Sequence, residues 1–297
     1  MERIVPHLWF NDNAKEAVNF YRTLFDDSKM MLEQKLDGTP SGENAAYYEF
    51  TLAGQLFGAL NGGPHFTFNP AISISVNCET IEETEVLWQK LIEGGRVLMP
   101  LQEYTFSKLY GWVEDKYGLS WQVIYTEGFE YEQKITMQLM FSGHMTGKAN
   151  EAIKYYTDLF KDGVIGDFHE YEEGQAVQED AKISHANFSI LDTEILASDN
   201  GTQTDYTFNE AISLMVLCVT QAEIDYYWEK LSADPEAEQC GWLKDKFGVS
   251  WQIVPANMNE LMSRGTQAQI DAVTQEFLKM KKLDKNHLER AWELAAE

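Results

Sequence analysis

Three polar side chains interrupt segments that otherwise have the apolar composition of buried strands. Gln122 and Gln252 alternate with apolar residues in two similar stretches, and Glu49 is a carboxylate among the bulky neighbours of 47–52. Alternate side chains of a strand point to opposite faces of its sheet, so each polar group could face the inside of a barrel or cup. There it could hydrogen-bond a bound molecule. The alternative is that Glu49 and Gln122 satisfy only each other or backbone groups.

The sequence lacks the motifs of several familiar reaction types. No nucleophile and base have a recognisable spacing, and there is no P-loop. A methyltransferase that uses S-adenosylmethionine would show a strand, a glycine-rich turn and a helix, and neither Gly62-Gly63 nor Gly94-Gly95 has that context. His185 is a lone histidine beside a predicted strand. The cysteines form no C-x-x-C pair and are expected to be small buried apolar residues (Cys78, Cys218 and Cys240).

An internal repeat must position these residues. The stretch 111–124 returns as 241–254, at an offset of 130, with eight of fourteen positions identical. An Asp-Lys-aromatic-Gly turn between apolar runs predicts strand, tight turn and strand in both copies. Residues 66–78 return as 206–218, at an offset of 140, and their alternation of apolar residues predicts a strand with one buried face.

Two helices are predicted in each half of the chain. Apolar residues at three- and four-residue spacing predict a helix over 14–25, and the matching positions in 149–160 repeat at an offset of 135. A second helix is expected after each of two capping boxes (Thr80 with Glu83, and Thr220 with Glu223). The order of elements in each half is therefore that of a pair of β-α-β-β-β units.

The repeat indicates the domain organisation. Domains are expected at residues 1–130 and 131–255, and the second is shortened near 232–240, where a strand or hairpin of the first half has no counterpart. The repeat ends at residue 255. The extension 256–297 is predicted to form two helices (266–281 and 284–296). Such a tail would pack against a domain or form the interface of a homodimer.

Composition excludes several classes of partner. Lys and Arg number 23 against 48 Asp and Glu, which gives a net charge of −25 in 297 residues. Such a surface repels phosphate backbones, so no nucleic-acid partner is expected. No apolar run is long enough to predict a membrane span, and the first residues lack the apolar segment of a signal peptide. We therefore expect a cytoplasmic protein without a membrane partner.

Several motifs in combination resemble one protein family. They are the Asn11–Tyr21 segment, the Leu60–Pro64 turn, the Phe66–Ser73 segment and the repeated stretch that ends in Ser-Trp-Gln. The chain resembles, over residues 1–255, the PhnB-like (3-demethylubiquinone methyltransferase-like) branch of the glyoxalase/bleomycin resistance/extradiol dioxygenase superfamily, also called vicinal oxygen chelate proteins. The resemblance implies an α+β fold of two tandem glyoxalase-like domains, in which paired β-α-β-β-β modules form cup-shaped open barrels, followed by C-terminal helices. This superfamily includes isomerases, dioxygenases, resistance-conferring binders and inactive members, so the fold alone names no reaction.

The metal ligands of the related glyoxalases can be carried over by position. In the first half they fall on His7, Glu49, about Ser73 and Gln122, and in the second half on a set without ionisable groups (Gln138, Asn187, about Ser213 and Gln252). Ions such as nickel and zinc prefer imidazole, carboxylate and thiolate to amide oxygen. The resemblance therefore implies a degenerate site. No cofactor is expected, apart from a divalent metal ion held weakly by His7, Glu49 and Gln122.

The leading hypothesis is a protein that binds a small, partly apolar molecule in its cups. The candidate ligand contacts are tryptophan and amide side chains, with one group in the first half (Trp9, Asn61, Trp112, Trp121 and Gln122) and one in the second (Trp242, Trp251 and Gln252). The indoles are also compatible with core positions. Two further hypotheses stay open: a metal-dependent lyase, isomerase or dioxygenase that uses His7 and Glu49, and a dimeric interaction module that binds no ligand.

Overall fold

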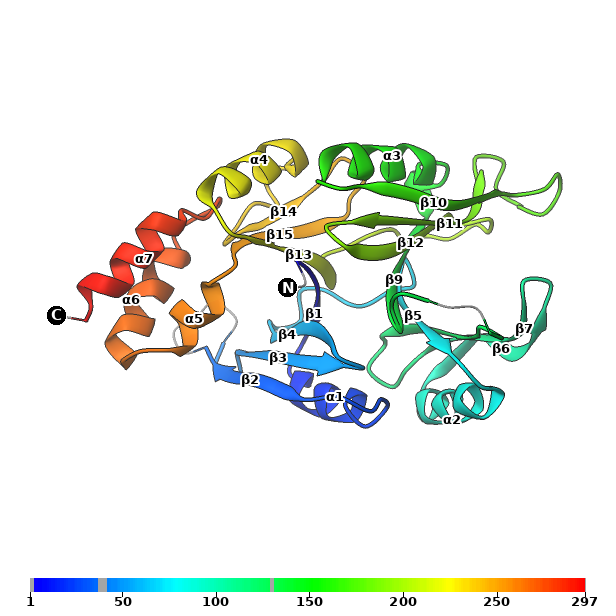
Figure 1. The fold of residues 1–297 in the computed structure, drawn as a ribbon, viewed down its shortest axis with the longest axis horizontal. Helices are drawn as coiled ribbons and strands as arrows, with labels where there is room; N and C mark the ends of the chain where they lie inside the picture. The colour runs from blue at the N-terminus through cyan, green and yellow to red at the C-terminus, as the bar shows by residue number, and fades with distance from the viewer. Residues whose placement is uncertain (1–2, 37–41, 129–130, 297) are drawn as a thin grey trace.

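The computed structural model describes residues 3–36, 42–128 and 131–296. These residues form two β-sheets with helices on their outer faces, and further helices follow at the C-terminal end (Figure 1). Four modules of the β-α-β-β-β type follow one another along the chain, and the last lacks one strand. The α+β fold that the resemblance implies is thus confirmed.

Modules 1 and 2 make up the first half of the chain. Module 1 consists of β1 (Ile4–Phe10), α1 (Ala14–Tyr21), β2 (Met30–Lys35), β3 (Ala46–Leu52) and β4 (Gln55–Asn61). Module 2 consists of β5 (Ile72–Cys78), α2 (Ile81–Ile92), β6 (Arg96–Tyr104), β7 (Ser107–Glu114) and β8 (Ser120–Tyr125).

Modules 3 and 4 and a helical tail make up the rest. Module 3 consists of β9 (Ile135–Phe141), α3 (Ala149–Leu159), β10 (Val164–Glu170), β11 (Ile183–Ile190) and β12 (Thr193–Asp199). Module 4 consists of β13 (Ile212–Cys218), α4 (Gln221–Leu231), β14 (Trp242–Lys244) and β15 (Ser250–Pro255). The tail carries α5 (Met258–Ser263), α6 (Gln267–Phe277) and α7 (Lys285–Leu294).

Each sheet combines one module from each half of the chain. The first sheet has the order β14-β15-β13-β1-β4-β3-β2, from modules 4 and 1, and the second has the order β10-β11-β12-β9-β5-β8-β7-β6, from modules 3 and 2. In each sheet the two modules meet at one antiparallel strand pair, which we call a seam. β1 lies against β13, with His7 opposite Ser213, and β5 lies against β9, with Ser73 opposite Gln138. Strands of the first half lie in both sheets, so the candidate ligand contacts that the sequence groups in the first half do not share one sheet. The domain boundary expected at residue 130 falls outside the described residues.

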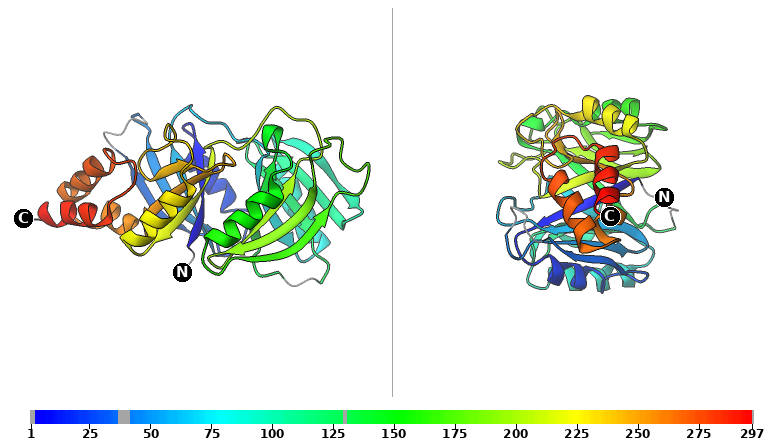
Figure 2. Two further views of the ribbon diagram at one scale, coloured as in Figure 1. Left: turned by 90° about the horizontal axis from the view of Figure 1, so that it is seen from above. Right: turned by 90° about the vertical axis from the view of Figure 1, so that its left-hand side faces the viewer.

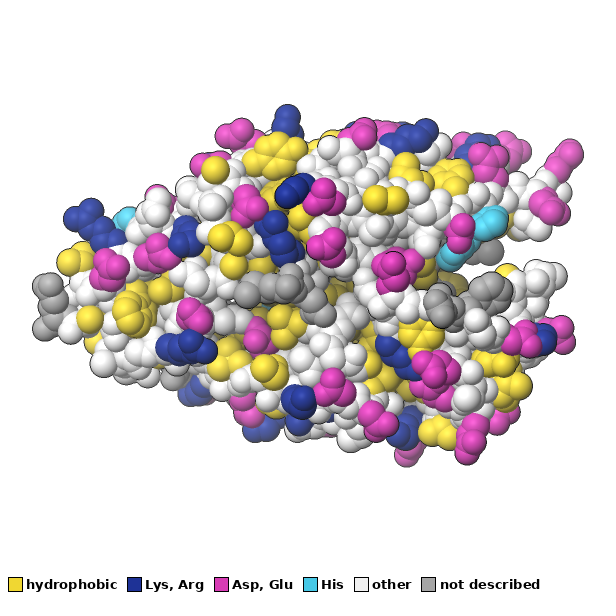
Figure 3. Space-filling view, in the orientation of Figure 1, with side chains coloured by type: hydrophobic (Ala, Val, Ile, Leu, Met, Phe, Trp, Pro, Cys, Tyr) yellow, Lys and Arg dark blue, Asp and Glu magenta, His cyan; other side chains and the backbone are white. Residues whose placement is uncertain are grey.

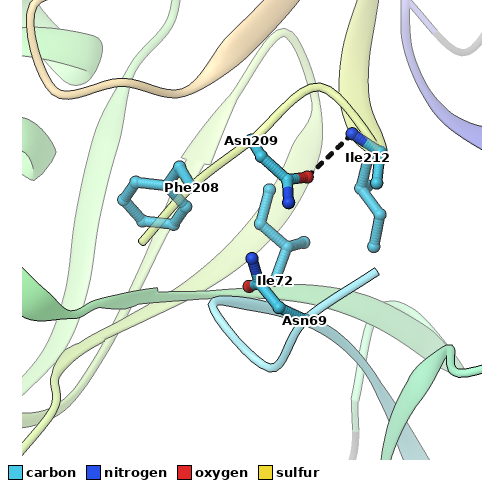
Figure 4. Close-up of a pocket in the computed structure, with 6 residues that line it drawn as sticks. Asn69, Ile72, Phe208, Asn209 and Ile212 are labelled. Carbon is cyan, nitrogen blue, oxygen red and sulfur yellow. Dashed lines mark hydrogen bonds between the residues drawn. The ribbon is translucent and has the colours of Figure 1, made fainter. Parts of the chain in front are cut away.

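A reciprocal pair of asparagines joins the two halves near the seams. Asn69 Nδ2 donates a hydrogen bond to the Thr207 carbonyl, and Asn209 Nδ2 donates to the Thr67 carbonyl, both at 2.9 Å. Each asparagine also accepts a hydrogen bond from the backbone N–H two residues ahead, which shapes the chain as it enters β5 or β13. Figure 4 shows both asparagines at a small pocket that apolar side chains complete (Ile72, Phe208 and Ile212). This repeated segment is therefore a joint between the halves.

The helices begin at local signals and bury one face. Thr80 accepts a hydrogen bond from the Glu83 backbone at the start of α2, and a complete capping box opens α4. The helix predicted over 14–25 is shorter in the structure, because α1 ends at Tyr21 and the chain then turns, with Asp27 at positive φ. The expected buried face of α1 is nevertheless present (Ala14, Ala17, Val18 and Tyr21).

The tail also departs from the prediction. α6 and α7 correspond to the two expected helices but are shorter, and α5 precedes them. The end-on view in Figure 2 shows the tail helices lying across the open side of the first sheet. Their apolar side chains form a cluster with residues of that sheet (Val5, Met215 and Val254). The tail therefore packs on its own chain.

A buried carboxylate fixes the repeated turn in each half. Asp245 accepts hydrogen bonds from the Tyr156 hydroxyl at 2.6 Å, the Trp251 indole at 2.8 Å and two backbone amides of the turn (Phe247 and Val249). Asp115 accepts from the equivalent turn of the first half and from the Trp121 indole. Burial raises the pKa of Asp245 to about 6, and the hydrogen bonds from its donors oppose this rise.

Asp245→Asn should lower the free energy of unfolding by roughly 1 to 3 kcal/mol, the cost of leaving buried donors without acceptors. The new amide keeps a single acceptor oxygen and turns its own N–H groups toward the donors. Urea unfolding followed by circular dichroism measures the change. Asp158→Asn, on the exposed side of α3, is the matched control and should change the free energy by less than about 0.5 kcal/mol. Equal effects of the two substitutions would contradict this role of Asp245.

Candidate functional site

Each sheet has an inner face turned away from α1–α4, and we call these faces the first cup and the second cup. Side chains alternate along a strand, so β1 places Leu8 in the main core and His7 in the first cup. In β8, Trp121 is a core residue and the adjacent Gln122 faces the second cup. The tail helices close the first cup. The second cup opens at the opposite end of the molecule, where Figure 3 shows a notch between the two arms of the sheet.

His7 lies at the floor of the first cup between two aromatic rings. Its ring stacks on Tyr47 at a centroid distance of 6.0 Å and makes an edge contact with Trp242 at 5.4 Å. Only 3 % of the residue is exposed, and its Nδ1 atom has no hydrogen-bond partner among the described residues. Burial lowers the pKa of His7 to about 3, so the imidazole is neutral at pH 7.

Glu49 faces the same cup from two strands away. His7 and Glu49 are both paired with Gly58, on either side of β4, which places their backbones roughly 10 Å apart at the usual strand spacing. The half-buried Glu49 carboxylate accepts a hydrogen bond from Asn259 of α5, and burial raises its pKa. Gly58 is needed between them, because a Cβ atom there would lie 2.9 Å from the His7 ring.

The two repeated glutamines have the same partner type in different cups. Gln252 donates a hydrogen bond to Ser213 at 2.9 Å in the first cup, and Gln122 donates to Ser73 at 2.7 Å in the second. Gln122 also accepts a hydrogen bond from the Tyr110 hydroxyl at 2.9 Å. Both amides are therefore engaged within the protein, by serine and tyrosine hydroxyls.

The residues predicted to hold a metal ion are not brought together. Gln122 belongs to the second sheet, so it neither joins His7 and Glu49 at an ion nor pairs with Glu49. The positions carried over from the glyoxalases divide between the first cup (His7, Glu49, Ser213 and Gln252) and the second (Ser73, Gln122, Gln138 and Asn187). Among residues 3–36, 42–128 and 131–296, no three His, Cys, Asp or Glu side chains form a group that could hold an ion. This donor set does not fit a transition-metal ion.

The predicted tryptophan contacts separate into cup and core. Trp9 and Trp242 lie against each other in the first cup at 6.0 Å, although they come from opposite halves of the chain. Trp112 faces the second cup and donates its indole N–H to Ser120 at 2.8 Å. The other two are fully buried against a helix tyrosine (Trp121 on Tyr21, and Trp251 on Tyr156). The cup position expected for these two is corrected, because each precedes a cup-facing glutamine and must point to the other face.

Asn61 is engaged at the start of a helix. Its Oδ1 atom accepts a hydrogen bond from the backbone N–H of Ala14 at 2.8 Å, and its Nδ2 atom donates to the Asn44 carbonyl. Asp199 accepts from Ala149 at 3.1 Å at the start of α3. Both side chains satisfy N–H groups that the first turn of a helix leaves free. The polar atoms of Asn61 thus position α1.

The second cup has a floor of neutral polar groups beside an aromatic wall. Side chains from four strands form two hydrogen-bonded pairs there (Gln122 with Ser73, and Gln138 with Ser198). Thr136, on the same face of β9 as Gln138, is 1 % exposed, and its hydroxyl has no partner among the described residues. Tyr110 and Trp112 of β7 form the wall. The floor and the wall therefore offer hydrogen bonds and aromatic surface from neutral side chains.

A histidine pair lies at the rim of the second cup. His169 of β10 is directly opposite His185 of β11, with ring centroids 6.2 Å apart. Burial and the nearby His169 lower the pKa of His185. Beside them, Asn187 donates to Glu194 at 2.8 Å, and both line a shallow pocket. Sequence reasoning missed this partner of His185, because the register of β10 on β11 contains irregularities that no periodicity predicts.

Comparison with known proteins identifies the family of the chain. The sequence profile of the 3-demethylubiquinone-9 3-methyltransferase family matches residues 2–124 and 133–254. The chain belongs to this family. The two matched segments are the tandem halves of the sequence, so the family domain occurs twice. No curated protein matches the chain, and no described helix has the length and apolar character needed to cross a membrane.

Two solved structures are similar to this chain. The PhnB protein from Bacillus cereus is 42% identical and covers 42% of this chain and 100% of its own, with a TM-score of 0.40. Glyoxalase I from Zea mays is 9% identical and covers 86% of this chain and 94% of its own, with a TM-score of 0.54. At that identity the likeness to glyoxalase I shows the fold alone. The fold and family implied by the sequence motifs are thus confirmed.

His7 should make the protein acid-sensitive. Its pKa falls from 6.5 in the unfolded chain to about 3 in the folded chain. As pH decreases between these values, the unfolded chain binds a proton that the folded chain does not, and stability is lost at roughly 1.4 kcal/mol per pH unit. His7→Gln removes this loss, so the difference in unfolding free energy between the variant and the original protein should shift in favour of the variant at lower pH. Urea unfolding at several pH values measures it.

The control for this experiment is His65→Gln, which replaces an exposed histidine. The unfolding free energies of the control and the original protein should keep a nearly constant difference across the pH series. A constant difference for His7→Gln as well would show that the buried imidazole is not the source of acid sensitivity.

Proposed function

We propose that the chain binds a small, uncharged and partly apolar molecule in the second cup. The observation that carries the proposal is the difference between the cups, since the tail helices close the first and the second is open to solvent (Figure 3). A concave face with an aromatic wall and a few polar groups suits a small ligand. In this proposal the family fold is kept, and the positions of the second cup that correspond to glyoxalase metal ligands carry amides and a hydroxyl.

The chemistry of the second cup supports an uncharged ligand. A flat ring can lie against Trp112, and a hydroxyl or carbonyl group of the ligand can exchange hydrogen bonds with the floor residues Gln122 and Gln138. At the rim, Glu132 and Glu194 line the shallow pocket. These carboxylates and the net charge of −25 disfavour an anionic ligand.

Methyl transfer is not part of the proposal, although the family description names it. The Gly62-Gly63 pair serves another purpose: Trp9 packs so closely on Gly62 that a Cβ atom there would lie 2.2 Å from the indole. The Trp9 indole also donates a hydrogen bond to the Gly63 carbonyl at 2.8 Å. Gly62 therefore makes room for Trp9. A metal-dependent reaction through His7 and Glu49 has no support from the donor set of the first cup.

A ligand screen tests this function. Uncharged bicyclic aromatic alcohols and amides should raise the melting temperature, and the matching carboxylates should not, because binding to the folded state alone stabilises it. Trp112→Leu should weaken the best hit by about tenfold or more in isothermal titration calorimetry, as expected for the loss of an aromatic contact. Trp242→Leu, which changes an indole of the closed first cup, is the matched control and should leave the affinity unchanged.

The proposal fails if no uncharged compound stabilises the protein. It also fails if Trp112→Leu and Trp242→Leu have the same effect on the affinity, because the second cup would then not be the site.

A further inference from the structure

We propose that the tip of the β6–β7 hairpin extends the second cup into an aromatic subsite. The ligand is then an elongated, uncharged molecule with a polar ring at the floor of the cup and a second aromatic group on Phe106. This subsite rests on the function proposed above and narrows the class of ligand. Phe106 is singled out by its exposure, its ring contacts and its place in a tight turn.

Phe106 is a large apolar side chain that the protein leaves in solvent. Its exposed fraction is 61 %, whereas the wall residue Tyr110 is only 7 % exposed. A single exposed apolar side chain is common on protein surfaces and indicates no site by itself. Phe106 differs from such a residue because its ring belongs to an aromatic group that reaches into the cup.

Three rings form this group, which we call the aromatic tip (Tyr104, Phe106 and Tyr110). The Phe106 ring stacks on Tyr104 with centroids 5.6 Å apart and makes an edge contact with Tyr110 at 5.0 Å. Tyr110 and Tyr104 also meet edge-on at 5.7 Å. These contacts position the Phe106 ring before any ligand arrives. Less side-chain ordering is then lost on binding, which favours affinity.

The aromatic tip is joined to the floor of the second cup. The Tyr110 hydroxyl donates a hydrogen bond to Gln122, whose amide donates to Ser73. Trp112 lies on the same face of β7 as Tyr110, two residues or roughly 7 Å along the strand. Aromatic surface therefore runs from Trp112 past Tyr110 to Phe106. A ligand whose first ring lies on Trp112 can reach the tip with a second ring.

The geometry of the turn does not account for Phe106. Tyr104 pairs with Ser107, so Thr105 and Phe106 form a two-residue loop between β6 and β7. Loops of this length favour glycine, asparagine and aspartate, and a phenylalanine gives the turn no advantage. Residues that break a local rule of this kind are expected at functional sites. The position of Phe106 therefore favours a role in binding.

Module 4, the counterpart of module 2 in the second half of the chain, has no such tip. Its strands, all of which are described, include none that corresponds to β6, and Cys240 stands where module 2 has Tyr110. Figure 1 shows the β6–β7 hairpin at the end of the molecule opposite the tail helices. Beside the tip, Lys108 is paired with Glu127 and Glu103 is exposed. These charges disfavour an anionic group on the second ring of the ligand.

Two ligands of different length test the subsite by isothermal titration calorimetry of the full chain. 2-Naphthol supplies the polar ring system alone, and 6-benzyloxy-2-naphthol adds a second aromatic ring at the far end of the same head. The added ring should improve the affinity of the original protein by about tenfold, because it gains an aromatic contact on Phe106.

Variants of Phe106 show where the added ring binds. Phe106→Ala should remove the gain in affinity and leave 2-naphthol binding within about twofold of the original, which also shows that the variant is folded. Phe106→Tyr keeps the aromatic ring and should retain the gain. Val86→Ala, the matched control, truncates an exposed apolar residue of α2 that is 51 % exposed and should change neither affinity.

The subsite is disproved if the benzyl ring adds no affinity, if the gain survives in Phe106→Ala, or if neither compound binds the original protein. Equal weakening of both compounds by Phe106→Ala also disproves it, because Phe106 would then only support Tyr110. The function of the second cup is judged separately, by the screen of uncharged compounds and the effect of Trp112→Leu on the best hit. It stands on those results whatever Phe106→Ala does.

Discussion

The antiparallel seams between β1 and β13 and between β5 and β9 are the constraint on which the rest of the structure depends. A module of this type has an incomplete sheet, and it buries its backbone edge by pairing with a module from the other half. The reciprocal hydrogen bonds of Asn69 and Asn209 lie where the chain enters these seam strands. Each complete sheet therefore contains strands from both halves of the chain.

The pairing of modules from different halves also decides which polar residues meet. His7 and Glu49 share a cup with Ser213 and Gln252 of the fourth module, whereas Gln122 lies in the other sheet. Gln122 and Gln252 each donate a hydrogen bond to a serine on the neighbouring seam strand. Such neutral hydrogen-bonded pairs tolerate burial without an ion. His7 keeps its imidazole, but burial holds it neutral.

Loss of one strand in module 4 breaks the symmetry between the cups. The tail takes its place, and the backbone amides of Cys240 and Gly241 hydrogen-bond to the loop before α7. The first cup is consequently closed by helices, while the longer β6–β7 edge leaves the second cup open (Figure 1). Two copies of one domain therefore present different inner faces to solvent.

The sequence by itself determined the local elements and the family. Apolar periodicity predicted the buried face of α1, paired capping residues predicted the starts of α2 and α4, and the repeated Asp-Lys-aromatic-Gly turn predicted the hairpin-like ends of both halves. These features depend on neighbours within a few residues. The same local rule, alternation along a strand, also shows why Trp121 must be core once Gln122 faces the cup.

Only the tertiary structure decided which modules pair, which cup each residue enters and how the tail packs. Strand pairing between halves depends on edges that are equivalent in each repeat, so periodicity gives no preference for one partner over the other. Trp9 meets Trp242, and His169 meets His185, through strand registers that include long sequence separations or bulges. The closure of the first cup likewise depends on an apolar cluster between the tail and the sheet. Such contacts are set by the geometry of the whole chain, because each involves surfaces that no single segment contains.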